Sequence, residues 1–238
     1  MAEPLLDVQG LAAGYARLPV LHGVDLAVQA GEVVGIVGPN GHGKTTLLRA
    51  ISGLLRPSGG HITSGGERLD RLRPDQIVAR GIVHVPQGDL LFPEMSVLEN
   101  LLMGAYLPAA ARRSAERLEF VFGLLPKLAQ RRHQMASTLS GGERRMVGIG
   151  RGLMAEGRLL MLDEPSLGLA PIVIDQIYEL IVDLKQRGMT ILVVEENAAR
   201  IAEHANQVHL LDNGRIAWHG RGAELLARPE ILETYLGA

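Results

Sequence analysis

Cysteine is absent from the 238 residues of this chain, which excludes disulfide bonds and thiolate metal ligands. Long hydrophobic runs are absent too. None approaches the roughly 18 residues that suggest a membrane-spanning helix, so a role at a membrane would be peripheral or would act through a partner. The net charge of −2 at pH 7 leaves no basic surplus, so nucleic acid is not expected as a partner. The first residues lack the features of an export signal, and export is not expected either.

Short apolar runs alternate with helical patterns along most of the chain, and 47% of the residues are hydrophobic. This alternation is typical of an α/β fold with a mainly parallel core sheet. The first thirty residues instead show short strands with turn glycines, at residues 5–11 and 20–28, which predicts an N-terminal antiparallel β subdomain. The core strands are predicted at residues 32–37, 81–85, 158–162, 190–194, 207–211 and 215–219.

Between about residues 96 and 156 only helical patterns occur. Ser96 and Glu99 have capping-box spacing at the start of one of these helices. We interpret approximately residues 88–157 as a helical subdomain that is inserted into the α/β core of a single domain spanning residues 1–238.

The stretch GPNGHGKT at residues 38–45 matches the pattern G-x-x-x-x-G-K-[ST] and lies between a predicted strand and a predicted helix. Glycines let the backbone curl so that successive amides face a polyphosphate, and the helix start adds its positive end. Lys44 is expected to reach the β and γ phosphates of ATP, and the Thr45 hydroxyl to ligate magnesium. The His42 side chain fills a variable slot and is interpreted as a bystander. The predicted ATP-binding residues of this loop are Gly38, Pro39, Asn40, Gly41, His42, Gly43, Lys44, Thr45 and Thr46.

The stretch RLLMLDEP is an apolar strand that ends in two carboxylates, Asp163 and Glu164. In isolation such a pair is equally well explained as a solvated turn. Beside a phosphate loop it predicts a magnesium site. Asp163 is expected to hold the ion, directly or through water, and Glu164 to polarise the attacking water.

Two glycines follow a serine in LSGGERR, far along the chain from the phosphate loop. Ser140 and Glu143 have S-x-x-E spacing, so Ser140 is expected to cap a helix from residue 141 to about residue 155. The free amides of its first turn would bind an anion. If this helix lies away from its own phosphate loop, the anion belongs to another molecule's ATP; an ordinary capped helix is the alternative.

These motifs, in this order, resemble those of the ATP-binding-cassette (ABC) ATPases, and the resemblance covers essentially the whole chain. It implies a P-loop ATPase that works as a dimer with two ATPs sandwiched between two cassettes. Ser140, Gly141 and Gly142 would then contact the γ-phosphate bound to the partner. The resemblance also implies that Gln87 contacts magnesium and relays movement to membrane subunits. Tyr15 matches the aromatic that stacks on adenine, with a strand residue packed on the sheet as the alternative.

Finer stretches look like the ATPases of branched-chain amino-acid importers, particularly the shorter F-type (LivF) subunit. They are VPQGDLLFPEMSVLENLLMGA, LSGGERRMVGIGRGLM, DEPSLGLAP and VVEENA. Importers of urea and short-chain amides look much alike. The resemblance implies a partner cassette of the G type or a homodimer, two membrane permeases and, indirectly, a solute-binding protein. It places the chain at the cytoplasmic face of the inner membrane, as a peripheral subunit. An apolar cluster would belong to the docking surface unless the helical subdomain buries it: Leu90, Leu91, Phe92 and Pro93.

Two positions depart from the general cassette pattern. Glu196 stands where most ABC ATPases have a histidine that donates to the γ-phosphate, so it joins Glu164 and Gln87 as a predicted catalytic position. A carboxylate facing phosphate would repel it, and we expect Glu196 to turn away, to pair with a basic residue or to be protonated. Ala170 replaces an aspartate that crosses the dimer in many cassettes. These departures motivate an alternative, a degenerate nucleotide-gated subunit whose partner does most of the hydrolysis. A soluble ABC protein of DNA repair or translation is less well supported, because the expected coiled-coil insert or second cassette is not found.

Overall fold

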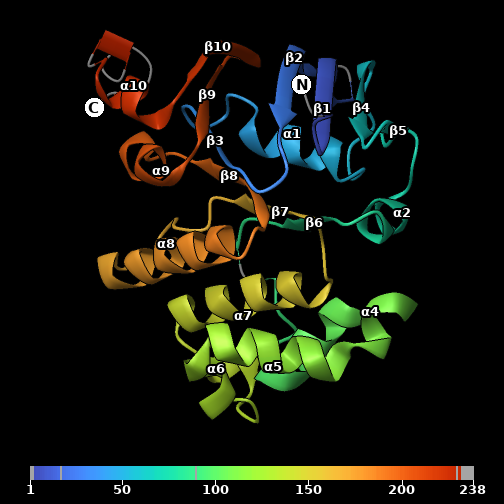
Figure 1. Ribbon diagram of the computed structural model, residues 1–238, viewed down its shortest axis with the longest axis vertical. Helices are drawn as coiled ribbons and strands as arrows, with labels where there is room; N and C mark the ends of the chain where they lie inside the picture. Colours follow the sequence, from blue (N-terminus) through green and yellow to red (C-terminus); the bar gives the residue numbers. More distant parts are fainter. Residues whose placement is uncertain (1–2, 17, 89, 229, 232–238) are drawn as a thin grey trace.

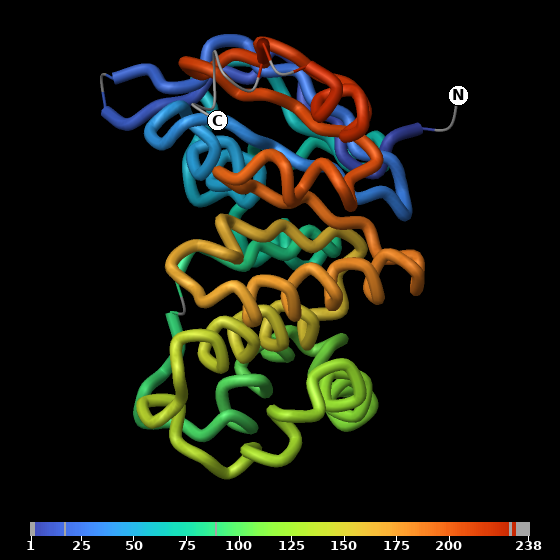
Figure 2. The backbone as a smooth tube through the Cα atoms, turned by 90° about the vertical axis from the view of Figure 1, so that its left-hand side faces the viewer, coloured from blue at the N-terminus to red at the C-terminus, as the bar shows by residue number. Residues whose placement is uncertain are grey.

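A computed structural model of the chain describes residues 3–16, 18–88, 90–228 and 230–231. In Figure 1 an antiparallel sheet and one end of a larger sheet lie together at one end of the longest axis, and a helical layer lies at the other end. The helical layer is again at one end when the molecule is turned by 90° (Figure 2).

The larger sheet has six strands in the order β10-β9-β3-β8-β7-β6. All neighbouring pairs are parallel except β9 and β10, which are antiparallel. Each strand lies within one residue of its predicted bounds, which confirms the predicted fold class. The strands are β3 (Val33–Val37), β6 (Ile82–Val85), β7 (Leu159–Asp163), β8 (Thr190–Glu195), β9 (Gln207–Asp212) and β10 (Arg215–Gly220).

The smaller sheet is antiparallel, with the order β2-β1-β4-β5. Its first two strands, β1 (Leu6–Tyr15) and β2 (Leu18–Val28), correspond to the predicted N-terminal strands. The other two, β4 (Gly59–Ser64) and β5 (Glu67–Arg68), follow helix α1 (Lys44–Ile51) and were not predicted. The predicted antiparallel sheet is thus present, but two of its four strands follow the first core strand in sequence. The sequence of β4 is short and contains two glycines, so it has little intrinsic strand propensity. Its hydrogen bonding to β1 is what makes it a strand.

Neighbouring residues of each core strand point to opposite faces of the six-stranded sheet. On one face, Val34 and Ile36 of β3 belong to a cluster that includes Leu47 and Leu48 of α1 and the buried side of the antiparallel sheet. On the other face, Val33 joins a cluster formed with the helical layer. Helix α1 thus lies between the two sheets, directly after the predicted phosphate loop.

Every named element between β6 and β7 is a helix, and these helices are drawn in green to yellow in Figure 2. Ser96 accepts a hydrogen bond from the Glu99 N–H, and Glu99 accepts one from the Ser96 N–H, which confirms the predicted capping box. The division into a subdomain at residues 88–157 stays an interpretation. The helices here are α3 (Val97–Leu102), η1 (Met103–Ala105), α4 (Pro108–Arg112), α5 (Ser114–Leu124), α6 (Pro126–Gln130), η2 (Ala136–Thr138) and α7 (Gly141–Met154).

The remaining helices are α2 (Pro74–Ala79), α8 (Pro171–Gln186), α9 (Ala198–His204) and α10 (Gly222–Leu226). Helices α8 and α9 contact β8, and α8 lies between the six-stranded sheet and the helical layer in Figure 1. A helix with the length and apolar character needed to cross a membrane does not occur among the described residues.

A buried histidine, His209, and a half-buried one, His84, predict acid sensitivity of the fold. Burial lowers the pKa of His84 and of His209 to about 4, so both are neutral in the folded protein at pH 5. An unfolded histidine titrates near 6.5, so their contribution to stability is complete above that pH and is lost as the pH falls toward 4. We expect each to remove about 2 kcal/mol from the free energy of unfolding between pH 7 and pH 5.

Urea unfolding at the two pH values tests this expectation. The His209→Gln variant should lose less stability on acidification than the wild type, whereas His133→Gln, at an exposed site, should behave like the wild type. An unchanged pH dependence in the His209 variant would contradict the prediction.

Candidate active site

The predicted phosphate loop connects β3 to α1. Three of its residues, Gly38, Gly41 and Gly43, have positive φ angles of 153°, 83° and 108°. A Cβ atom on Gly38 would lie 2.1 Å from the carbonyl oxygen of Leu211 in β9, so only glycine fits there. No side chain caps α1, whose first residue is Lys44, so its first turn presents backbone amides beside the loop.

Lys44 lies inside this loop and is only 3% exposed. Its ammonium group donates to the carbonyl oxygens of Gly38, at 2.8 Å, and Pro39, at 3.2 Å. The same nitrogen lies 3.4 Å from Oε1 of Glu164. The lysine is therefore held between the loop and the acidic end of β7.

Parallel pairing explains how β7 delivers its carboxylates to the loop. Strands β3 and β7 both pair in parallel with β8, so their carboxyl ends meet at one edge of the sheet. The Thr45 hydroxyl donates to Oδ1 of Asp163 at 3.1 Å. Oδ2 of Asp163 is buried and has no hydrogen-bond partner among the described residues. Burial raises the pKa of this carboxyl group, an effect that Thr45 opposes and the Glu164 carboxylate reinforces.

A hydroxyl oxygen and a carboxylate with one unpartnered oxygen are hard ligands of the kind that magnesium prefers. A cation beside Asp163 would also offset the cost of burying this carboxylate. The residues present therefore fit the predicted magnesium site.

Glu164 follows β7 in a left-handed backbone conformation, with φ 47°. Its N–H donates to the carbonyl oxygen of Val194 at 2.9 Å, and its carbonyl oxygen accepts from Arg145 at 3.0 Å. Its carboxylate accepts a hydrogen bond from Nε2 of Gln87 at 2.8 Å. The carboxylate thus lies between the Gln87 amide and the ammonium group of Lys44.

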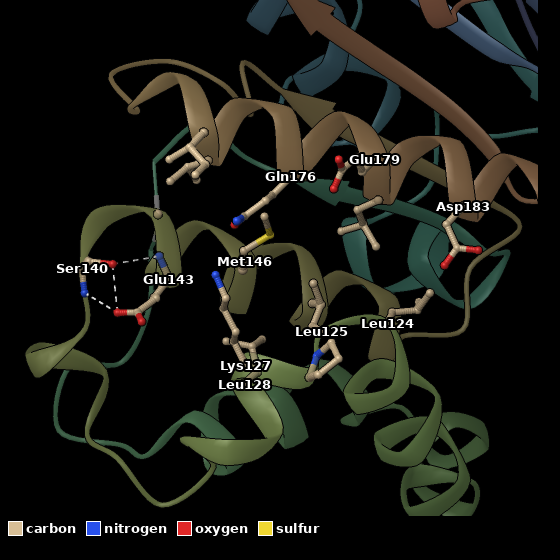
Figure 3. A pocket seen from close by; sticks show the side chains of 15 residues that line it. Leu124, Leu125, Lys127, Leu128, Ser140, Glu143, Met146, Gln176, Glu179 and Asp183 are labelled. Atoms are coloured by element: carbon tan, nitrogen blue, oxygen red, sulfur yellow. Dashed lines mark hydrogen bonds between the residues drawn. The ribbon is translucent and has the colours of Figure 1, made fainter.

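The LSGGE motif forms the start of α7, in the helical layer. Ser140 Oγ accepts from the Glu143 N–H at 3.3 Å, and Glu143 accepts from the Ser140 N–H at 2.9 Å, as predicted for a capping box (Figure 3). Ser140 and Gly142 line one end of a cleft of about 520 Å³ that separates α6 and α7 from α8. In both overall views this layer is separate from α1. Ser140 is exposed and does not point into the core of its own chain.

The other predicted side chains are those of Tyr15, of His42 within the loop itself and of Glu196. Tyr15 ends β1, is 40% exposed, and its hydroxyl accepts from Arg49 of α1 at 3.2 Å. Stacking on adenine and packing on the sheet therefore both stay predictions for Tyr15. His42 Nδ1 lies 2.8 Å from Oδ1 of Asp212, which holds the ring against the turn after β9. Glu196 is exposed directly after β8, and its side chain makes no hydrogen bond or ion pair within the described ranges.

The structure thus brings together Lys44, Thr45, Gln87, Asp163 and Glu164, while Ser140, Gly141 and Gly142 form a second group at the start of α7. Sequence reasoning missed two residues beside Glu164. One is Arg145, a charged residue on the buried face of α7. The other is Glu195, which ends the apolar run TILVVE in the same way that Asp163 ends LLMLD, and this shared pattern was the available signal.

Comparisons with known proteins agree with this geometry. A family model described as ABC transporter matches residues 21–167. The high-affinity branched-chain amino acid transport ATP-binding protein BraG of Pseudomonas aeruginosa is 40% identical, with 98% of this chain and 100% of that protein covered. The probable branched-chain amino acid transport ATP-binding protein LivF of Archaeoglobus fulgidus is 36% identical, with 98% and 99% covered. A solved ATP-binding cassette of an ABC transporter, in its ADP conformation, matches with a TM-score of 0.86 at 30% identity, with 100% of both chains covered.

Proposed function

The chain belongs to the ABC transporter family and is an ATPase, and on this premise we propose that it powers an importer of branched-chain amino acids. The main support for ATP hydrolysis is the position of the Glu164 carboxylate. It lies between Lys44 and Gln87, beside the Thr45–Asp163 pair. The proposed solute class is supported by the names of the full-length relatives BraG and LivF.

The phosphate loop and Lys44 bind the triphosphate in this proposal. The amides around Gly41 and at the start of α1 face the phosphate oxygens, and Lys44 neutralises their charge. Thr45, Asp163 and Gln87 would hold magnesium, which supplies further positive charge to the phosphate groups when it is bound. Tyr15 lies beside α1, where its ring stacks on the adenine.

Glu164 acts as the general base. Its carboxylate orients the attacking water and accepts a proton from it as the water oxygen bonds to the γ-phosphorus. The bond between the γ-phosphorus and the β–γ bridging oxygen breaks in the same displacement, and ADP and phosphate are the products. Gln87 donates to one carboxylate oxygen and thereby fixes the direction of the group. Ser140, Gly141 and Gly142 close over the γ-phosphate bound to the partner cassette, because the α7 start is exposed and separate from its own loop.

The partners in this proposal are a second cassette, of the G type or another copy of this chain, and two permeases at the cytoplasmic face of the inner membrane. A solute-binding protein acts indirectly through the permeases. The predicted docking cluster is largely on the surface: Leu90 is 66% exposed and Phe92 is 43% exposed. Leu91 is instead half-buried against the core. Arg151 of α7 donates to the Leu90 carbonyl oxygen at 2.9 Å and so supports the exposed loop.

The degenerate-subunit alternative is motivated by Glu196 and Ala170. The exposed, unpaired side chain of Glu196 leaves the cluster around Glu164 intact. Measuring turnover while the partner's own base is disabled separates the alternatives, because a degenerate subunit would then show almost no hydrolysis.

Replacing Glu164 by glutamine removes the proton acceptor while keeping the shape of the side chain. We expect ATP hydrolysis to fall by about two to four orders of magnitude with ATP binding retained. Steady-state phosphate release and equilibrium ATP binding measure the two quantities. Glu119→Gln, at an exposed site of α5, is the matched control and should hydrolyse ATP like the wild type. Unchanged hydrolysis in the Glu164 variant would contradict the assignment of Glu164 as the general base.

Replacing Phe92 by serine should weaken co-purification with the permease pair without reducing the ATPase activity of the isolated chain. The reason is the loss of apolar area from an exposed ring. Leu54→Ser, at a 62% exposed site after α1, is the control and should co-purify normally.

The same complex, reconstituted in vesicles with its solute-binding protein, tests the solute. ATP-dependent uptake of labelled leucine is expected. Uptake of urea or acetamide in place of leucine would replace the proposed solute class and leave the ATPase assignment intact.

A further inference from the structure

A carboxylate that has no role in the mechanism above is buried at the end of β8. Glu195 is 2% exposed and pairs in register with Val37, directly before the phosphate loop. Burial raises the pKa of this group, and the nearby Glu164 carboxylate raises it further. Such a group is costly to bury unless hydrogen bonds compensate it, so its position calls for a specific partner.

That partner is Ser166, two residues after the base. The Ser166 N–H donates to Oε1 of Glu195 at 3.1 Å, and the Ser166 hydroxyl donates to Oε2 at 2.9 Å. No lysine or arginine forms an ion pair with Glu195 in the part of the chain that the structure describes. Both oxygens of the buried carboxylate therefore accept hydrogen bonds from Ser166. The Tyr178 hydroxyl is a further neighbour, and its pKa is raised by burial and by the Glu195 carboxylate.

The turn that contains Ser166 is strained at Glu164. A residue other than glycine costs about 1–2 kcal/mol in a left-handed conformation, so the surroundings must hold it there. Val194 binds the Glu164 N–H, and Arg145 binds its carbonyl group. Glu195 adds a third restraint two residues farther along, from the same strand as Val194.

The restrained segment continues to the start of α7. The Leu169 N–H donates to the Ser166 carbonyl oxygen at 3.3 Å. A Cβ atom on Gly141 would lie 3.9 Å from the Leu169 side chain, and one on Gly142 would lie 2.7 Å from Val173. The segment anchored at Ser166 therefore packs against the first turn of α7.

We propose that Glu195 is a positioning residue for ATP hydrolysis, which holds the turn of Glu164 and the adjoining segment in register through its paired hydrogen bonds to Ser166. This inference rests on the proposed role of Glu164 as the base. Glu195 does not touch the nucleotide. It acts by keeping the Glu164 carboxylate aimed at the site of attack and by keeping residues 166–173 against α7.

Four variants of the full chain test the proposal: Glu195→Gln, Ser166→Ala, Ser166→Thr and the double variant S166A/E195Q. In Glu195→Gln the negative charge that strengthens both hydrogen bonds is lost and the amide NH2 group replaces one acceptor oxygen, and in Ser166→Ala the hydroxyl donor is removed. Small misplacements of a reacting group reduce turnover strongly. We therefore expect Glu195→Gln and Ser166→Ala each to lower kcat about tenfold or more. The KM for ATP and the equilibrium ATP affinity should stay within about twofold of the wild type, since only the chemical step is affected.

The conservative variant Ser166→Thr and the double variant complete the test. Ser166→Thr keeps the hydroxyl and should retain most of kcat, and the double variant should be little worse than either single variant because both remove one interaction. Ser137→Ala, at an exposed site, is the control and should match the wild type.

The proposal is overturned if both single variants keep kcat within about twofold of the wild type, or if their effects multiply fully in the double variant. It is also overturned if Ser166→Thr loses as much kcat as Ser166→Ala, or if ATP binding falls as much as turnover. These outcomes are distinct from a failure of the proposed function, in which Glu164→Gln itself would leave hydrolysis unchanged.

Discussion

The parallel pairing of β3, β8 and β7 is the constraint on which the site depends. Val37 lies opposite Glu195, and Val194 lies opposite Asp163, so three strand ends meet at one edge of the sheet. The phosphate loop leaves the first of these strands and the two carboxylates of DEP leave the third. Lys44 and Glu164 are 120 residues apart in sequence, and this shared edge of the sheet is what brings them together.

Close contact between a lysine, two carboxylates and an amide is electrostatically demanding. Burial raises the pKa of Asp163, and one of its oxygens has no partner among the described residues. Groups kept at such a cost are typical of sites that bind charged ligands. The strained backbone of Glu164 belongs to the same pattern, since its left-handed conformation is held by contacts from β8 and α7.

Helix α7 connects three parts of the molecule that the function requires. Its first turn carries the Ser140 cap, Arg145 in its second turn binds the Glu164 carbonyl group, and Arg151 near its end binds the carbonyl group of Leu90. Through these contacts α7 links the exposed loop at Leu90 to Glu164 and to its own first turn. This arrangement suits a subunit that couples hydrolysis to a membrane partner.

The sequence by itself determined the elements that depend on neighbouring residues: the glycine loop before Lys44, the capping boxes at Ser96 and Ser140, and the apolar strands of the core. Their hydrogen bonds and side-chain periodicities are local, so short patterns are enough to identify them. Only the tertiary structure decided that β4 pairs with β1, that Gln87 binds Glu164, that Glu195 binds Ser166 and that Glu196 stays on the surface. These features depend on strand order and on a strained turn, which join residues distant in sequence and leave no periodic signal in it.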